Sequence, residues 1–185
     1  MRNWLKQSTW YWGYKAMETE VQRSKQGKSV SNRFLTFYLE NEIYGVHIFD
    51  VKEIIAMMKT TPVPKTPKFI QGVMNLRGNI IPVVDMRLKF DMPSIPPQAY
   101  TAIVIIRLGE KQIGFIVDKV EEVINVDDEH LTPPPEFGEH IDTRFIKSMA
   151  QYKQKVVMIL DLLALFGDEE LSMVENLSKT ASDKG

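Results

Sequence analysis

The segment from Gly72 to Phe90, GVMNLRGNIIPVVDMRLKF, carries two apolar runs on either side of a tight polar break. The returning run is rich in β-branched residues, which fit a pleated, half-buried surface. The break contains Gly78 and Asn79, two residue types that tolerate the positive φ angles of a tight turn. Pro82 cannot donate a backbone hydrogen bond, so an edge strand or a bulge is expected there. The segment predicts a β-hairpin with Arg77 at its tip, where a solvated loop arginine is the ordinary expectation.

Similar apolar runs, separated by turn residues, recur along most of the chain. They predict further short strands, joined largely as hairpins, over residues 34–39, 43–48, 100–108, 112–117, 120–126, 144–152 and 156–160. The run at 100–108 is continuous, which predicts a strand buried on both faces. About eight to ten short strands with closely spaced turn signals indicate a mainly β barrel or sandwich.

A short amphipathic helix is predicted over residues 49–57, because apolar residues recur there at helical spacing. Glu53 would lie beside this apolar stripe. The stripe could serve core packing or form a partly exposed binding surface, and the sequence leaves both interpretations open. The residues of the stripe are Val51, Ile54, Ile55 and Met58.

The two ends of the chain differ in composition from its centre. Residues 1–32 combine an aromatic cluster that has no helical period with a polar stretch, and three interpretations remain. The segment is a disordered tail, or it lies upstream of a true start at Met17, or its tryptophans form an interfacial anchor. The first two are favoured because no amphipathic face forms.

Residues 33–167 are expected to form one domain, with a subdomain junction in the proline-rich segment 91–98. Asp161 is a good N-cap for a last short helix over residues 162–166, and a glycine follows as its stop. Residues 168–185 are expected to be a polar tail that extends this helix and then frays.

The net charge excludes one large class of partners. With a formal charge of −1 and an isoelectric point near 6.3, the chain has no excess of basic residues to neutralise phosphates, so nucleic acid is not an expected partner. The chain has no cysteine, which suits a reducing compartment. No apolar run approaches the roughly 18 residues of a membrane span, and a cytoplasmic protein without direct membrane insertion is expected.

No convincing catalytic or metal-binding pattern is present, so neither an enzyme nor a cofactor is expected. His47, His130 and His140 are widely spaced, and the last two could meet a metal only with Glu136 or Glu139, at no recognised ligand spacing. Two carboxylates, Asp85 and Asp118, each follow an apolar strand, where they more often end a strand or cap a turn than act as acid or base.

The hairpin segment, together with Gly114 to Val123 (GFIVDKVEEV), resembles the CheW family of bacterial chemotaxis coupling proteins, and the similarity extends over most of residues 33–166. The resemblance implies a CheW-like fold of two intertwined five-stranded SH3-like β-barrels with short helices and a groove between them. It also implies a non-enzymatic adaptor, monomeric alone and part of receptor arrays in the cell. Such adaptors couple the cytoplasmic tip of chemoreceptors, the methyl-accepting chemotaxis proteins, to the regulatory domain of the histidine kinase CheA.

Two sets of site residues follow from the resemblance. A receptor helix is expected to insert into the groove, where Arg77 suits a carboxylate of the partner and Glu53 offers the opposite charge. The receptor-binding candidates are Val51, Glu53, Ile54, Gly72, Arg77, Ala102 and Val123. The kinase-binding or array-contact candidates are Phe137, as an aromatic anchor, and Thr132, at a place where relatives can carry a basic residue.

Two other functions remain as alternatives. The β-barrel architecture and the aromatic content would suit a small-barrel protein that binds single-stranded nucleic acid, but the basic groove that such binding needs is missing. A membrane-peripheral protein anchored by Trp4, Trp10 and Trp12 is the other alternative, and it concerns the N-terminal segment more than the domain.

Overall fold

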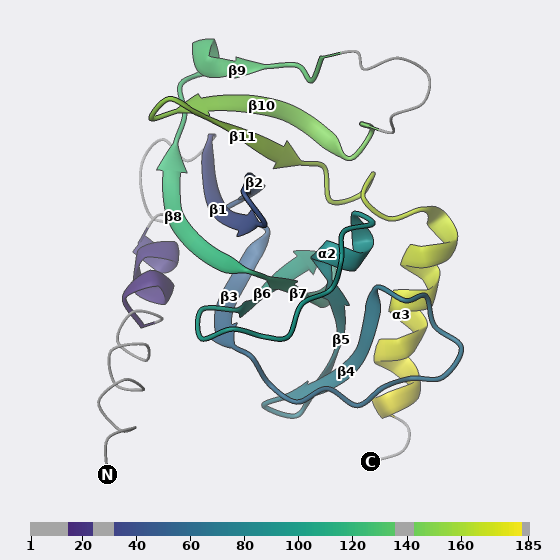
Figure 1. Cartoon of the computed structure of the whole chain (residues 1–185). Coiled ribbons are helices and arrows are strands. Elements are labelled where there is room, and N and C mark those ends of the chain that lie inside the picture. The colour runs from purple at the N-terminus through teal and green to yellow at the C-terminus, as the bar shows by residue number, and fades with distance from the viewer. Residues whose placement is uncertain (1–14, 24–31, 136–142, 183–185) are drawn as a thin grey trace.

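The computed structural model describes residues 15–23, 32–135 and 143–182, which form two β-sheets with short helices around them (Figure 1). The first sheet has the strand order β8-β1-β2-β11-β10-β9. Its strands are β1 (Arg33–Leu39), β2 (Glu42–His47), β8 (Lys119–Asn125), β9 (Leu131–Thr132), β10 (Ile146–Tyr152) and β11 (Lys155–Leu160). The two-residue β9 makes this sheet six-stranded, one strand more than the family resemblance implies.

The second sheet has five strands in the order β3-β6-β7-β5-β4. They are β3 (Val51–Ala56), β4 (Ile70–Leu76), β5 (Asn79–Asp85), β6 (Ala102–Leu108) and β7 (Lys111–Val117), and the helical elements are α2 (Met86–Lys89), η1 (Asp128–His130) and α3 (Asp168–Ser182). The described residues therefore form a mainly β protein, as predicted.

The chain passes from the first sheet to the second and back, which interleaves the two units. After β1 and β2 it builds the whole second sheet, and β8 then returns to pair with β1. Strand β11 completes the first sheet by pairing parallel to β2. The prediction of two intertwined units is confirmed. The main core cluster, which includes Leu35, Phe37, Val104 and Phe115, draws residues from both sheets.

The predicted central hairpin is formed by β4 and β5. Arg77 and Gly78 both have positive φ angles, of 53° and 88°, as a two-residue turn between strands requires. The Asn75 side chain supports this turn by accepting a hydrogen bond from the Gly78 N–H at 2.8 Å. Asn79, expected within the turn, instead begins β5 and pairs with Leu76.

The helix predicted over residues 49–57 is wrong, because Val51–Ala56 form strand β3. The register against β6 shifts between Val51 and Glu53, and such a bulge inserts one extra residue. The bulge places Val51 and Ile54 in the same core cluster, although they are three residues apart. Their spacing therefore imitates a helical period.

The edge strand predicted as one possibility at Pro82 is not found, since β5 lies between β7 and β4, but the register against β4 shifts close by, between Ile70 and Gly72. Val73, the partner of Pro82 on β4, exchanges both of its backbone hydrogen bonds with Thr61. No backbone hydrogen bond is therefore required between Val73 and Pro82. On the other side, the pairing with β7 covers only Val83 to Asp85. The missing N–H of the proline therefore interrupts no ladder.

The proline-rich segment 91–98 is not the junction between the two sheets. It connects α2 to β6, and both β5 before it and β6 after it belong to the second sheet. The chain crosses between the sheets after β2 and after β7 instead.

Both terminal segments contain more structure than their composition predicts. Residues 15–23, part of the expected disordered tail, are helical, with Val21 fully buried; we call them the N-terminal helix. Residues 162–166 form turns, with Asp161 accepting hydrogen bonds from the N–H groups of Leu163 and Ala164. The segment expected as a polar tail forms α3, which lies against β5 and buries Val174.

Candidate functional site

The N-terminal helix lies beside β3 and β8, the strands at one edge of each sheet (Figure 1). On the β3 side, Gln22 Nε2 donates a hydrogen bond to the backbone oxygen of Lys52 at 3.4 Å. On the β8 side, helix and strand enclose a cavity of about 520 Å³. Its lining residues are Ala16, Thr19, Glu20, Arg23, Arg33, Val123, Ile124 and Asn125. We call this surface of β3 and β8 the β3–β8 groove.

Four of the receptor-binding candidates belong to the core beneath this surface or pack against it, and of these four only Val123 lines the cavity. Val51, Ile54 and Ala102 belong to the main core cluster, and Val123 packs against it. Strand register explains the grouping, because Ile54 pairs with Val104 on β6, and Ala102 begins the same strand two residues earlier. Residues two apart on a strand share one face. Val51, Ile54 and Ala102 are buried, whereas Val123 is half-buried.

Glu53 and Arg77 lie on the other face of β3 and pair with each other. Glu53 is opposite Ile105, which belongs to the separate cluster inside the second sheet. The Arg77 Nη1 donates to Glu53 Oε1 at 2.9 Å and lies 2.8 Å from Oε2. The carboxylate is buried and the arginine side chain is 69% exposed. A partner carboxylate at Arg77 would therefore share the guanidinium with Glu53.

Gly72 has a structural requirement of its own. Its φ is +128°, and a Cβ atom there would lie 2.2 Å from the backbone oxygen of Thr61. Real Cβ atoms do not approach backbone that closely, so the bridge between Thr61 and Val73 demands glycine here. The sequence pattern gave no sign of this close approach.

Of the two kinase-binding candidates, Thr132 lies within the described residues. Thr132 is exposed on the short edge strand β9, where its hydroxyl lies 3.4 Å from the Met149 backbone oxygen. Phe137 lies outside the described residues. Its predicted role as an aromatic anchor stays a prediction.

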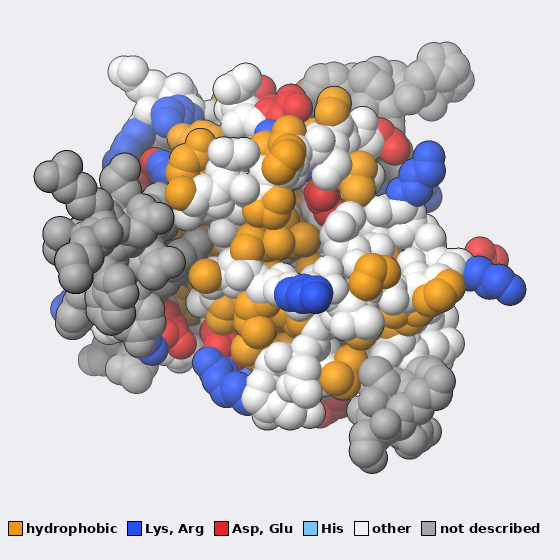
Figure 2. All heavy atoms as spheres, turned by 60° about the horizontal axis from the view of Figure 1, so that its bottom comes forward, with side chains coloured by type: hydrophobic (Ala, Val, Ile, Leu, Met, Phe, Trp, Pro, Cys, Tyr) orange, Lys and Arg blue, Asp and Glu red, His pale blue; other side chains and the backbone are white. Residues whose placement is uncertain are grey.

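An apolar face was missed by the sequence reasoning. Figure 2 shows hydrophobic side chains gathered on the side of the molecule that carries the second sheet. Large apolar side chains left exposed include Met58, Ile95 and Tyr100, at 39%, 41% and 45%. Met58 and Tyr100 each lie two residues beyond the Ala56–Ala102 pair, and this register is visible only in the folded chain.

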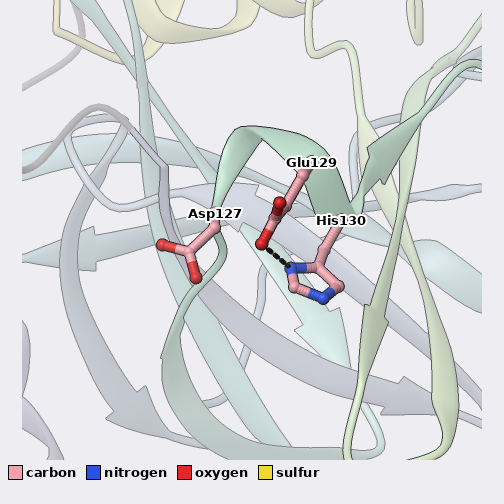
Figure 3. A group of neighbouring side chains, drawn as sticks. All are labelled: Asp127, Glu129 and His130. Atoms are coloured by element: carbon pink, nitrogen blue, oxygen red, sulfur yellow. Dashed lines mark ion pairs between the residues drawn. The ribbon is translucent and has the colours of Figure 1, made fainter.

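Ionisable groups also gather near η1, where the side chains of Asp127, Glu129 and His130 bring one ligand atom each within 4.8 Å of the others. Figure 3 shows the Glu129 carboxylate directed at the His130 ring, with 3.9 Å between Oε1 and Nδ1. All three residues are exposed, and clusters of exposed acidic groups are common without an ion, so we assign no metal to them. The other residues considered with His130, at 136, 139 and 140, lie outside the described residues.

A second cavity, of about 430 Å³, lies between the sheets near His47. The His47 ring packs against Phe34 and Phe49, and its Nδ1 accepts a hydrogen bond from the Phe49 N–H at 3.4 Å. Burial raises the pKa of the nearby Asp50 carboxyl above its ordinary value. Aromatic packing and backbone contacts thus position this histidine.

No helix within the described parts of the chain is long and apolar enough to cross a membrane.

Comparison with known proteins gives one consistent result. Residues 33–170 match the family model of the CheW-like domain. The chemotaxis protein CheW of Klebsiella aerogenes is 33% identical over 154 residues, which cover 83% of this chain and 93% of that protein. The chemotaxis protein CheW of Treponema pallidum is 29% identical over 149 residues, covering 78% and 88%. The crystal structure of the scaffolding protein TtCheW from Thermoanaerobacter tengcongensis has a TM-score of 0.68 and 38% identity, and covers 73% of this chain and 92% of that one.

Proposed function

The chain belongs to the CheW-like domain family, and we propose that it is a non-enzymatic adaptor that couples chemoreceptors to the histidine kinase CheA in bacterial chemotaxis. Relatives that share a third of its residues over nearly their whole length carry the name of chemotaxis protein CheW, and a similar structure is described as a scaffolding protein. An adaptor of this kind needs two separate surfaces, one for each partner.

The β3–β8 groove is the observation that carries the proposal. Val123 of β8 lines its cavity, and Val51, Ile54 and Ala102, from β3 and β6, belong to the core cluster against which Val123 packs. The groove also accommodates a helix already, since Met17 and Val21 of the N-terminal helix pack into the same cluster. Apolar side chains one turn apart on a helix are the usual anchors of helix-in-groove recognition. The receptor tip is a helical coiled coil, and the groove suits one of its helices.

A second surface would serve the regulatory domain of CheA. Exposed apolar side chains commonly mark protein contacts, and Met58, Ile95 and Tyr100 are candidates for this contact because they are 39%, 41% and 45% exposed. Thr132 and Phe137 are the array-contact candidates from the family resemblance. The proposal places the protein in the cytoplasm as a monomer that is recruited to receptor arrays.

Single-stranded nucleic acid is not favoured as an alternative ligand. The formal charge is −1, whereas binding to a phosphate backbone depends on a basic groove. Several of the aromatic side chains that motivated this alternative pack on one another. Tyr44 stacks on Phe37 and Phe90, and Phe90 stacks on Phe145, so these rings are not free to stack on bases.

Amide NMR of the labelled full chain tests the proposal, with separate titrations of a receptor-tip fragment and the CheA regulatory domain. We expect the receptor fragment to perturb amides of β3 and β8, and the kinase domain to perturb a different set. Val123→Asp should weaken receptor binding, whereas the matched change Val156→Asp should not, because Val156 is 55% exposed on β11. No perturbation by either partner at concentrations well above the micromolar range would reject the proposed function.

A further inference from the structure

We propose that the N-terminal helix is a built-in competitor for the receptor helix, so that it must leave the β3–β8 groove before a partner helix can bind there. This inference rests on the proposed function and extends it. It assigns a role to residues 15–23, which precede the region that matches the CheW-like domain.

The helix binds the groove through one apolar face. Met17 and Val21 are one turn apart and therefore lie on the same side of the helix. Val21 is fully buried, and both residues belong to the cluster that contains Val51 and Ile54. Away from this face lies Lys15, which is exposed and pairs with Glu18. The contact thus has the form of an amphipathic helix in an apolar groove.

The helix lies against both sheet edges, with a hydrogen bond to β3 and a shared cavity with β8. Gln22 donates to the Lys52 backbone oxygen on the open edge of β3. On the other side, Glu20 and Asn125 line the same cavity between the helix and β8. Open sheet edges offer unpaired backbone groups that a covering element protects. A partner helix would cover the same two edges.

The occupied surface coincides with the receptor-binding candidates. Val123 lines the cavity with the helix, and Val51 and Ile54 share its cluster. Two helices cannot fill one groove, so a receptor helix binds only the fraction of molecules whose groove is open. The apparent affinity is reduced by that fraction. Because the competitor is on the same chain, its effective concentration does not fall when the protein is diluted.

Cross-linking tests the occupancy of the groove without any partner. The chain has no cysteine, so Glu20→Cys with Asn125→Cys creates a single pair of thiols, both at exposed positions of the cavity. A short bismaleimide should join this pair within the full-length monomer. The control pair, Glu20→Cys with Lys65→Cys, should not react, because Lys65 lies beside α3 on the other side of the second sheet (Figure 1). Failure of the first pair to cross-link would overturn the proposal.

Binding of a receptor-tip fragment then tests the competition. Val21→Asp places a charge on the buried face and should raise the affinity about tenfold, since full burial of a valine corresponds to a factor of that order. Lys15→Asp introduces the same group at an exposed position of the helix that does not line the cavity, and it should leave the affinity unchanged. The cross-linked protein should not bind the fragment, although it should still bind the CheA regulatory domain, which serves as a check of its fold.

Each outcome decides between the two proposals. If wild type and Val21→Asp bind the fragment equally well, or if the cross-linked protein binds it, the competition is wrong and the adaptor function stands. If neither form binds the fragment or the kinase domain, the adaptor function itself is wrong, and the competition with it. Should Val21→Asp prove unfolded in thermal melts, the cross-linked protein alone decides.

Discussion

Arg77 and Glu53 join the two edge strands of the second sheet by an ion pair of 2.8 Å. Glu53 belongs to β3 and Arg77 follows β4, and these strands stand at opposite ends of the order β3-β6-β7-β5-β4. The pair therefore links the two ends of this strand order through side chains, and the backbone edges of β3 and β4 are not paired with each other. Two residues implicated in partner binding thus have a structural role within the chain.

The ion pair should contribute to stability mainly through the buried carboxylate. Arg77→Ala leaves Glu53 buried without this partner, and we expect a loss of about 1–2 kcal/mol in the free energy of unfolding, since unpaired buried charges are costly. Glu53→Gln combined with Arg77→Ala should recover part of that loss. Urea unfolding of both single variants and the double variant measures the coupling. Lys59→Ala, at an exposed lysine beyond β3, is the control. If the losses of the two single variants simply add in the double variant, Glu53 and Arg77 do not stabilise the fold as a pair.

Gly72 should tolerate no side chain, whatever its part in partner binding. Gly72→Ala would bring a Cβ atom to 2.2 Å from the Thr61 backbone oxygen, at a φ of +128°. We expect the free energy of unfolding to fall by more than about 3 kcal/mol, because only a movement of β4 would relieve the clash and the backbone strain. Gly78→Ala is the matched control. Its φ is +88° and nothing lies within 4 Å, so about 1 kcal/mol is expected. Thermal unfolding compares the two, and equal losses would refute this account.

The hairpins were predictable from sequence because their information is local. Alternating apolar residues and turn residues such as Gly78 determine where β4 ends and β5 begins, and the same holds for the β6–β7 hairpin around Gly109. Strand β3 was not predictable in this way. Its bulge beside Lys52 exists only because β6 lies opposite, and that pairing joins residues about fifty positions apart.

The candidate site was predictable in part, for a similar reason. Family resemblance gave Val51, Ile54 and Val123 as groove residues, and the structure brings them into one cluster. Neither the pairing of Glu53 with Arg77 nor the N-terminal helix over the groove follows from spacing, because both are contacts between segments distant in sequence. The N-terminal segment was interpreted from its aromatic cluster, which has no helical period, and not from the spacing of Met17 and Val21.

Arg87 should be among the most important polar residues of the fold. Its guanidinium donates two hydrogen bonds to Asp118, at 2.7 and 2.6 Å, and one to Glu40 at 3.1 Å. It thereby ties α2 to the point where the chain crosses back to the first sheet. Arg87→Ala should lower the free energy of unfolding by about 3 kcal/mol, because it leaves the half-buried Asp118 without its bidentate partner.

Urea unfolding measures this loss, and Arg107→Ala is the matched control. Arg107 is exposed and donates one side-chain bond, to the Phe49 backbone oxygen at 3.0 Å, so its removal should cost less than about 1 kcal/mol. Similar losses of unfolding free energy for both variants would show that the contacts of Arg87 stabilise the fold no more than those of a surface arginine.

Tyr44 should make the protein sensitive to alkaline pH. Burial, followed by the charges of Glu42 and Glu40, raises the pKa of this phenol from 10.0 to about 12. A group with a raised pKa contributes stability that is complete below its unfolded pKa and is lost as the pH rises through the folded pKa. Between about pH 8 and pH 11, the unfolding free energy of wild type should therefore fall by about 1 kcal/mol more than that of Tyr44→Phe, which has no phenol to ionise and keeps the stacking on Phe37 and Phe90.

Urea unfolding across this range measures the difference, because the lysines that also titrate there are common to both proteins. Parallel stability curves for wild type and Tyr44→Phe would show that the phenol ionises as easily in the folded chain as in the unfolded one.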